Sequence, residues 1–324
     1  MKGCDIMQVD LKPEELLKYN GISPKPDDFD EFWDTSIEEM KKIDPSLELV
    51  PCKWNFIGVD AYDMYFTGVD NARIHAKYMR PQGAKNCPAV FMFHGYGGVS
   101  GGWTYLLEYA SQGYCVAALD CRGQGGTSED CSCVKGNTLH GHIIRGLESD
   151  SPRDLLFTKI FLDVAQIVNI VEKFDEVDEN RLFAKGGSQG GALTFVCASL
   201  CPQIKAASAC YPFLSDYKRV WEMDMDERAY SELKEFFRNT DPRHEKEDET
   251  FMKLGYIDIQ NMANRIKGKM LMFTGLMDIV CPPSTQFAAF NKITSEKKVL
   301  FYPEFGHEGL PECEELTMEW FKSL

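Results

Sequence analysis

The stretch that most constrains how this chain can fold is residues 181–191, RLFAKGGSQGG. Within it, GGSQG gives a G-x-S-x-G pattern centred on Ser188, after a short apolar run and before ALTFVCASL, which has helical spacing. Strand, tight turn and helix are the context in which this motif forms a nucleophile elbow. The serine then sits in a strained turn, and the residues two before and two after it must lack bulk. The alternative is a glycine-rich turn with an idle serine.

Short apolar runs bounded by turns predict a mostly parallel central sheet with helices on both faces, which is an α/β-hydrolase fold. Alternating residues between 53 and 80, including the run KWNFIGV, predict an antiparallel start to this sheet. We treat 1–324 as one domain, with a helical extension over 1–50 and a charged helical insert over 211–266. The insert is expected either to cap the site or to form a solvated helical pair. The predicted buried strands are 88–93, 114–118, 182–184, 206–210, 269–273 and 297–302.

The net charge of the chain argues against two classes of partner, nucleic acids and membranes. The chain has 324 residues with 50 acidic and 35 basic side chains, a formal net charge of −15. An acidic surface repels phosphate backbones, so we expect no nucleic acid and no membrane partner. The N-terminus lacks an apolar leader, and the 12 cysteines are scattered, which together predict free thiols in a cytoplasmic protein.

Two loops after buried strands are predicted to support the site. HGYGG follows the strand over 88–93 and predicts an oxyanion loop, in which the backbone N–H groups of Tyr96 and Gln189 bind the developing negative oxygen. A dinucleotide-binding loop is the alternative, but Ser100 stands where its last glycine should be. Arg122 and Gln124, in the R-G-Q-G stretch after the next strand, are predicted to support the site. Arg122 is either an internal clamp on carboxylates or a surface charge.

Ser188, Asp278 and His307 occur in the chain order of α/β-hydrolases, each in a loop after a strand. His307 is the candidate base, and Asp278 would hold its imidazole in the correct tautomer. A loop histidine and a helix N-cap are the alternatives for these two residues. No cofactor is expected.

One group of cysteines and histidines could form a metal site. Cys131, Cys133, His140 and His142 lie in the long polar loop over 126–152, but their spacing matches no common zinc motif. We therefore expect no metal.

Several motifs along the chain resemble those of a known family. HGYGG, DCRGQGGTS, GGSQGG, GLMDIVCPPSTQFAAFN and HEG, in this order, are similar to carbohydrate esterase family 7, the acetyl xylan esterases and cephalosporin-C deacetylases. The resemblance implies a cytoplasmic serine esterase that deacetylates small acetylated sugars without a metal. It places the nucleophile on Ser188, the acid on Asp278, the base on His307 and the oxyanion donors on Tyr96 and Gln189.

The resemblance also implies a homo-oligomer, commonly a hexamer, with subunit contacts in the 126–152 loop. The Cys131-Ser132-Cys133 composition departs from the family pattern there. Two other functions remain open from the residues alone: a peptidase of the prolyl oligopeptidase kind and a catalytically idle hydrolase fold that serves as a binding protein. The residues do not select the acetylated compound, the oligomer size or the role of the insert.

Overall fold

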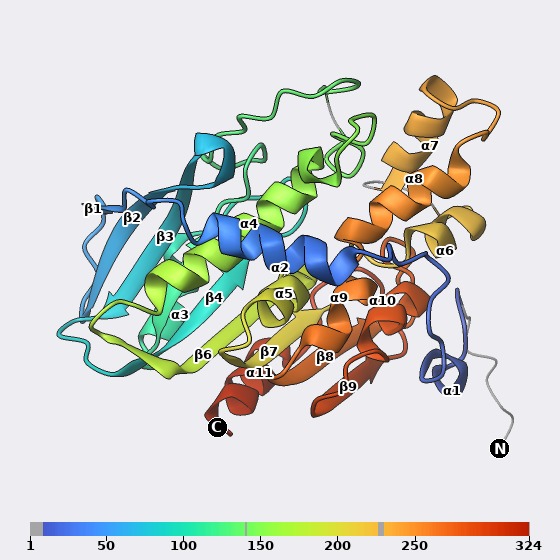
Figure 1. Cartoon of the computed structure of the whole chain (residues 1–324). Helices are drawn as coiled ribbons and strands as arrows, with labels where there is room; N and C mark the ends of the chain where they lie inside the picture. The colour runs from blue at the N-terminus through green and yellow to red at the C-terminus, as the bar shows by residue number, and fades with distance from the viewer. Residues whose placement is uncertain (1–8, 140, 226–229, 324) are drawn as a thin grey trace, which may run out of the picture.

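The structure is a computed structural model that describes residues 9–139, 141–225 and 230–323. Its centre is a nine-stranded sheet in the order β1-β2-β3-β5-β4-β6-β7-β8-β9 (Figure 1). The strands are β1 (Glu48–Pro51), β2 (Val59–Thr67), β3 (Arg73–Pro81), β4 (Cys87–Phe93), β5 (Cys115–Leu119), β6 (Val177–Gly187), β7 (Ile204–Cys210), β8 (Lys269–Gly275) and β9 (Lys297–Tyr302).

The predicted mixed sheet is confirmed. β1, β2, β3 and β5 pair in antiparallel fashion, and the pairs from β5 through β4, β6, β7 and β8 to β9 are all parallel. Parallel strands place their carboxyl ends at one edge, where α/β proteins bind ligands. One part of the antiparallel prediction is wrong: residues 53–58 form turns before β2 begins at Val59. Trp54 and Ile57 are exposed there, and only Phe56 and Val59 of KWNFIGV pack against the smaller core.

Helices cover both faces of the sheet, as predicted, and they are listed here with the short 3₁₀ turns: α1 (Pro13–Leu16), α2 (Phe29–Met40), η1 (Val69–Asn71), α3 (Trp103–Ala110), η2 (Pro152–Asp154), α4 (Leu156–Val171), α5 (Gln189–Leu200), α6 (Tyr217–Glu222), α7 (Ser231–Asn239), α8 (Glu247–Leu254), η4 (Gly255–Ile257), α9 (Ile259–Met262), η5 (Ala263–Arg265), α10 (Pro283–Phe290) and α11 (Cys313–Lys322).

Alternation along β4 decides which helices pack on which face. Phe91 and Phe93 join the large core beneath α2, α4 and α5, whereas Val90 and Met92 join a smaller core with residues of α3 and α11. Successive strand residues point to opposite faces, so a fully apolar strand needs a helical layer on each side. α2, from the N-terminal extension, packs across α4 and so forms an outer layer (Figure 1).

The insert between β7 and β8 contains α6, α7 and α8, which stand beyond the sheet beside the loop that precedes η2 (Figure 1). The division of the chain into one domain with an extension over 1–50 and an insert over 211–266 stays a prediction. Within the described part of the chain, no helix is both long enough and apolar enough to cross a membrane.

Candidate active site

The turn between β6 and α5 holds Ser188 in an unusual backbone conformation. Its φ of 58° and ψ of −121° lie where L-residues are strained, and its N–H donates to the carbonyl of Cys210 at 3.0 Å. The flanking glycines are required by close backbone approach. A Cβ on Gly190 would lie 2.0 Å from the Phe93 oxygen, and one on Gly186 would lie 2.5 Å from the Gly190 backbone. The elbow predicted from G-x-S-x-G is therefore present.

Three residues from three loops meet at the carboxyl edge of the sheet. His307 Nε2 lies 3.0 Å from Ser188 Oγ, and His307 Nδ1 lies 2.8 Å from Asp278 Oδ2. Ser188 and His307 are half-buried, whereas Asp278 is fully buried. With Nδ1–H donating to the carboxylate, Nε2 is left as an acceptor for the serine hydroxyl. The imidazole is thus oriented as a base toward the serine.

The turn after β8 holds the Asp278 carboxylate from its other side. Its Oδ1 accepts the backbone N–H groups of Val280 and Cys281, each at 2.8 Å. These two donors stabilise the negative charge and leave Oδ2 free to face His307. Asp278 does not cap the helix after Pro283, because its side chain is occupied within its own turn and by His307.

Two neighbours of this cluster were missed by the sequence analysis. The Tyr211 ring packs against the His307 imidazole with centroids 4.5 Å apart. The buried Cys281 thiol lies beside Ser188, and burial raises its pKa well above the usual value, so it remains a neutral thiol. Tyr211 directly follows β7, and the end of β7 accepts the Ser188 N–H. The order of the strands could therefore have predicted that Tyr211 lies beside the site.

The loop after β4 is fixed by His94. The backbone N–H of Cys121 donates to His94 Nε2 at 3.0 Å, so Nδ1 carries the proton and donates to the Gly95 carbonyl at 2.8 Å. Burial lowers the pKa of His94, which favours this neutral form. The histidine therefore ties the predicted oxyanion loop to the turn that follows β5.

Gln124 joins the two residues predicted as oxyanion donors. Its Oε1 accepts the N–H of Gly97, next to Tyr96, at 2.9 Å. Its Nε2 donates to Gln189 Oε1 at 2.7 Å. Gln189 is the first residue of α5, where a backbone N–H has no acceptor within the helix. One side chain thus sets the spacing between the loop after β4 and the start of α5.

Arg122 is an internal residue, which decides between the two alternatives for it. The side chain is 0% exposed, and its Nε and Nη2 each lie 2.6 Å from a carboxylate oxygen of Asp163 in α4. It also donates to the Val69 carbonyl. This bidentate ion pair anchors the turn that carries Gln124 to α4.

The insert reaches the site through Glu232 of α7. The Tyr96 hydroxyl donates to Glu232 Oε1, and the N–H of Ile143, in the 126–152 loop, donates to Oε2 at 2.7 Å. The Tyr96 oxygen also accepts the N–H of His142 at 3.0 Å. Glu232 is 5% exposed, and burial raises its pKa to about 7. One carboxyl group therefore connects the insert, the long loop and the residue predicted to donate to the oxyanion.

Three side chains of metal-ligating type meet at this site. Asp278, Cys281 and His307 have donor atoms within 4.8 Å of one another. A neutral thiol beside a carboxylate already paired with the imidazole fits a hydrogen-bonded network better than a metal centre. In the alternative cluster, His142 Nε2 already bonds to the Gly123 carbonyl at 2.7 Å, and His140 lies outside the described residues.

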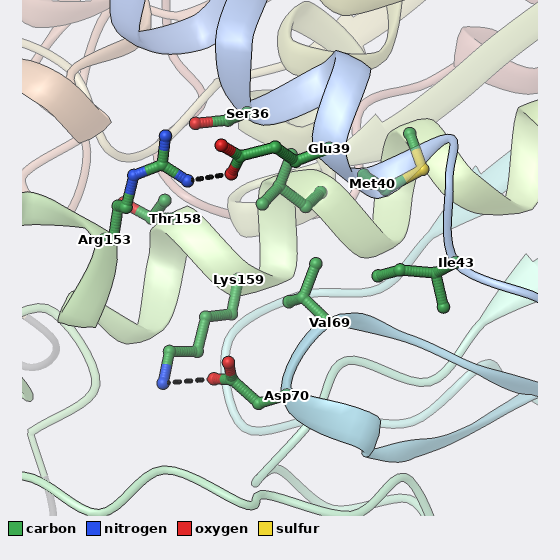
Figure 2. Close-up of a pocket in the computed structure, with 10 residues that line it drawn as sticks. Ser36, Glu39, Met40, Ile43, Val69, Asp70, Arg153, Thr158 and Lys159 are labelled. Atoms are coloured by element: carbon green, nitrogen blue, oxygen red, sulfur yellow. Dashed lines mark hydrogen bonds and ion pairs between the residues drawn. The ribbon is translucent and has the colours of Figure 1, made fainter.

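A separate cleft lies away from this edge, between α2 and α4 (Figure 2). Its volume is about 210 Å³, and its charged groups are paired as Arg153 with Glu39 and Lys159 with Asp70. Paired charges leave little for a ligand to satisfy, so we assign the active site to the sheet edge.

Comparison with known proteins agrees with this geometry. A family model described as acetyl xylan esterase (AXE1) matches residues 6–324. The chain belongs to the acetyl xylan esterase family. It is thus a carboxylic ester hydrolase, and the resemblance and fold class predicted from the sequence are confirmed.

Individual relatives cover nearly the whole chain. Acetyl xylan esterase 1 from Thermoanaerobacterium sp. JW/SL YS485 is 49% identical with a TM-score of 0.95, over 97% of this chain and 99% of that one. The acetyl xylan esterase from Paenibacillus sp. R4 is 33% identical with a TM-score of 0.92 over the same shares. Acetyl esterase Axe7A of Xylanibacter ruminicola is 28% identical, over 98% of this chain and 70% of that protein.

A likeness to a peptidase is limited to the fold. The acylaminoacyl peptidase of Pyrococcus horikoshii is 18% identical with a TM-score of 0.56, over 87% of this chain and 42% of that one. The family match therefore favours an esterase over the peptidase alternative.

Proposed function

We propose that this family member is an acetyl esterase that works through an acyl-enzyme, with Ser188 as nucleophile, His307 as base and Asp278 as its orienting acid. The observation that carries the proposal is the pair of contacts made by His307, 3.0 Å to the serine oxygen and 2.8 Å to the carboxylate. A serine hydroxyl becomes an effective nucleophile only when a positioned base removes its proton.

In this mechanism His307 Nε2 takes the Ser188 proton as Oγ attacks the acetyl carbonyl carbon. The resulting oxyanion is held by the backbone N–H groups of Tyr96 and Gln189. His307 then gives its proton to the departing sugar oxygen, and the acetyl group remains on Ser188. Water attacks the acetyl-enzyme with His307 again as base, and acetate leaves.

Small acetylated sugars such as xylo-oligosaccharides are the proposed substrates, supported by the similarity of this chain to two acetyl xylan esterases. Cephalosporin C, with its acetate ester, is a second candidate by family resemblance. A screen of acetate release over acetylated xylo-oligosaccharides, other sugar acetates and cephalosporin C ranks them by kcat/KM. Cytoplasmic location and hexameric assembly stay predictions, and a native mass measurement tests the assembly.

The decisive experiment replaces the nucleophile. Ser188→Ala is expected to lower kcat for p-nitrophenyl acetate by about 10⁶-fold, the scale seen when a serine nucleophile is removed. Ser111→Ala, a serine exposed at the end of α3, is the matched control and should keep wild-type activity. An organophosphonate should label Ser188 in the wild type. Retained turnover by Ser188→Ala, with circular dichroism showing a folded protein, contradicts the proposed nucleophile.

The acyl group is tested with a substrate series. The rate should fall steeply from p-nitrophenyl acetate to the octanoate ester. Equal rates on the two would reject a short-acyl preference while leaving the nucleophile assignment intact. Faster hydrolysis of a proline-containing peptide amide than of the acetate would favour the peptidase alternative.

A further inference from the structure

Two cysteines far apart in sequence meet next to the active site. Cys210 is the last residue of β7 and Cys313 is the first residue of α11, and their Sγ atoms lie 3.0 Å apart. They are 103 positions apart in the chain, and both are half-buried free thiols. A disulfide requires a sulfur separation of about 2.05 Å, so the two atoms need to approach by only about 1 Å.

Cys313 is the more reactive thiol of this pair. The hydrogen bond with the Cys210 thiol lowers the pKa of Cys313 despite the opposing effects of burial and Glu314, and the same contact raises the pKa of Cys210. The thiol also stands at the N-terminus of a ten-residue helix, where the helix dipole favours negative charge. The thiolate is the form that attacks oxidants, and the half-buried position leaves part of Cys313 open to solvent.

Another close pair in the chain lacks these properties. Cys197 lies on α5 and Cys201 directly follows that helix, and both are buried. Burial raises the pKa of the Cys197 thiol well above its usual value. Both thiols are closed off from solvent, unlike Cys210 and Cys313, so an oxidant does not reach them and this pair is an internal control.

We propose that Cys210 and Cys313 form a redox modification site, at which a hydroperoxide drives formation of a reversible disulfide that slows ester hydrolysis. The Cys313 thiolate attacks one peroxide oxygen, giving a sulfenic acid as the O–O bond breaks and hydroxide leaves. The Cys210 thiol then attacks that sulfur, and water leaves as the S–S bond forms. In sum, two thiols and hydrogen peroxide give one disulfide and two waters.

Both cysteines are linked to the proposed catalytic groups. The Cys210 carbonyl accepts the Ser188 N–H at 3.0 Å, and the next residue, Tyr211, packs against the His307 ring. Cys313 lies just beyond the loop that carries His307. Drawing the end of β7 and the start of α11 together by about 1 Å displaces the serine relative to its base, and a shift of that size can reduce the rate by about 10²-fold. We expect a loss of at least tenfold in kcat.

The test treats the full-length enzyme with hydrogen peroxide, alkylates it after unfolding, and maps tryptic peptides by mass spectrometry. A disulfide-linked peptide pair containing Cys210 and Cys313 is expected, while Cys197 and Cys201 remain alkylated. Acetate release should fall at least tenfold in parallel and recover with dithiothreitol. Cys313→Ser, compared with its own untreated sample, should neither cross-link nor lose activity.

Three outcomes overturn the proposal. The first is that Cys210 and Cys313 remain reduced at peroxide concentrations that oxidise the exposed Cys131 and Cys133. Alternatively, the cross-link forms and kcat is unchanged, which removes the link to catalysis. Equal loss of activity in Cys313→Ser assigns the effect to another oxidised residue. Because the cross-link is read by mass, failure here is distinguishable from failure of the proposed esterase mechanism.

Discussion

The two sides of the candidate active site are held by different means. On the sheet side, Ser188, Asp278 and His307 each lie in a turn or loop that follows a strand, and backbone pairing of parallel strands brings these strand ends together. On the side of the insert and the 126–152 loop, here called the entrance side, Tyr96 is held by Glu232, by the N–H of His142 and by the ring of Phe213. The sheet side is therefore specified by the fold, and the entrance side by a few side-chain contacts.

Substitutions on the two sides should therefore have different effects on catalysis. A change on the sheet side leaves the backbone frame in place and removes a chemical group from the reaction. A change on the entrance side loosens the position of Tyr96 without removing any reacting group. We therefore expect large losses in kcat with normal folding from the first kind, and moderate losses from the second.

Among the variants that keep Ser188, Asp278→Asn should lose the most activity. The Val280 and Cys281 N–H groups will hold the amide oxygen, which turns the NH₂ toward His307 Nδ1. Nδ1 must then accept, so the ring proton moves to Nε2 and faces Ser188. The wrong tautomer should lower kcat about 10⁴-fold, as in serine proteases, with little change in Tm.

Asp241→Asn is the matched control for that prediction. Asp241 is a buried carboxylate in the insert that also accepts two backbone N–H groups, from Glu245 at 2.9 Å and Lys246 at 2.8 Å. Its replacement should leave kcat within about twofold, because it touches no residue of the site. Similar kcat losses in both variants would break the distinction between the two sides.

The same distinction explains how much of the molecule the sequence could predict. Local patterns in the sequence predict the strand ends, the elbow glycines and the order of Ser188, Asp278 and His307. Because the strands pair in parallel, their carboxyl ends lie at one edge of the sheet, and this brings the three residues together. Arg122 remained ambiguous because its partner, Asp163, is a single carboxylate on a helix that otherwise reads as apolar.

Contacts between distant side chains carry no local pattern. Glu232 is one acidic residue among many in a charged insert, so its contact with Tyr96 could not be selected from composition. The approach of Cys210 to Cys313 likewise depends on the strand order of the finished sheet. The role of the insert was therefore left open by the sequence, and the Glu232 contacts favour a cap that supports the site.

A moderate effect is expected from Glu232→Gln. The amide offers one acceptor where the carboxylate offered two, so either the Tyr96 hydroxyl or the Ile143 N–H faces an NH₂ group. Tyr96 should then be less well placed, and kcat for an acetate ester should fall about tenfold, part of the 10²–10³ typical of losing an oxyanion donor. Glu249→Gln, an exposed change on α8, should be neutral. Unchanged kcat in Glu232→Gln would show that the insert covers the site without positioning Tyr96.

Glu232 should also impose a pH dependence on the stability of the fold, with no loss of a reacting group. Burial raises its folded-state pKa to about 7 from an ordinary 4.5, so between these values the folded chain binds more proton than the unfolded chain. Stability therefore falls as pH rises through this window, and the contribution of Glu232 declines by up to about 3 kcal/mol before it levels off above pH 7.

Urea unfolding of the wild type and of Glu232→Gln at several pH values between 4 and 8 isolates this contribution, because other buried carboxyls such as Asp258 are common to both proteins. The difference in unfolding free energy, wild type minus variant, should be largest near pH 4.5 and smallest above pH 7. Parallel curves would mean that Glu232 titrates as an ordinary surface carboxylate. The entrance side would then be held together by contacts other than this buried carboxyl group.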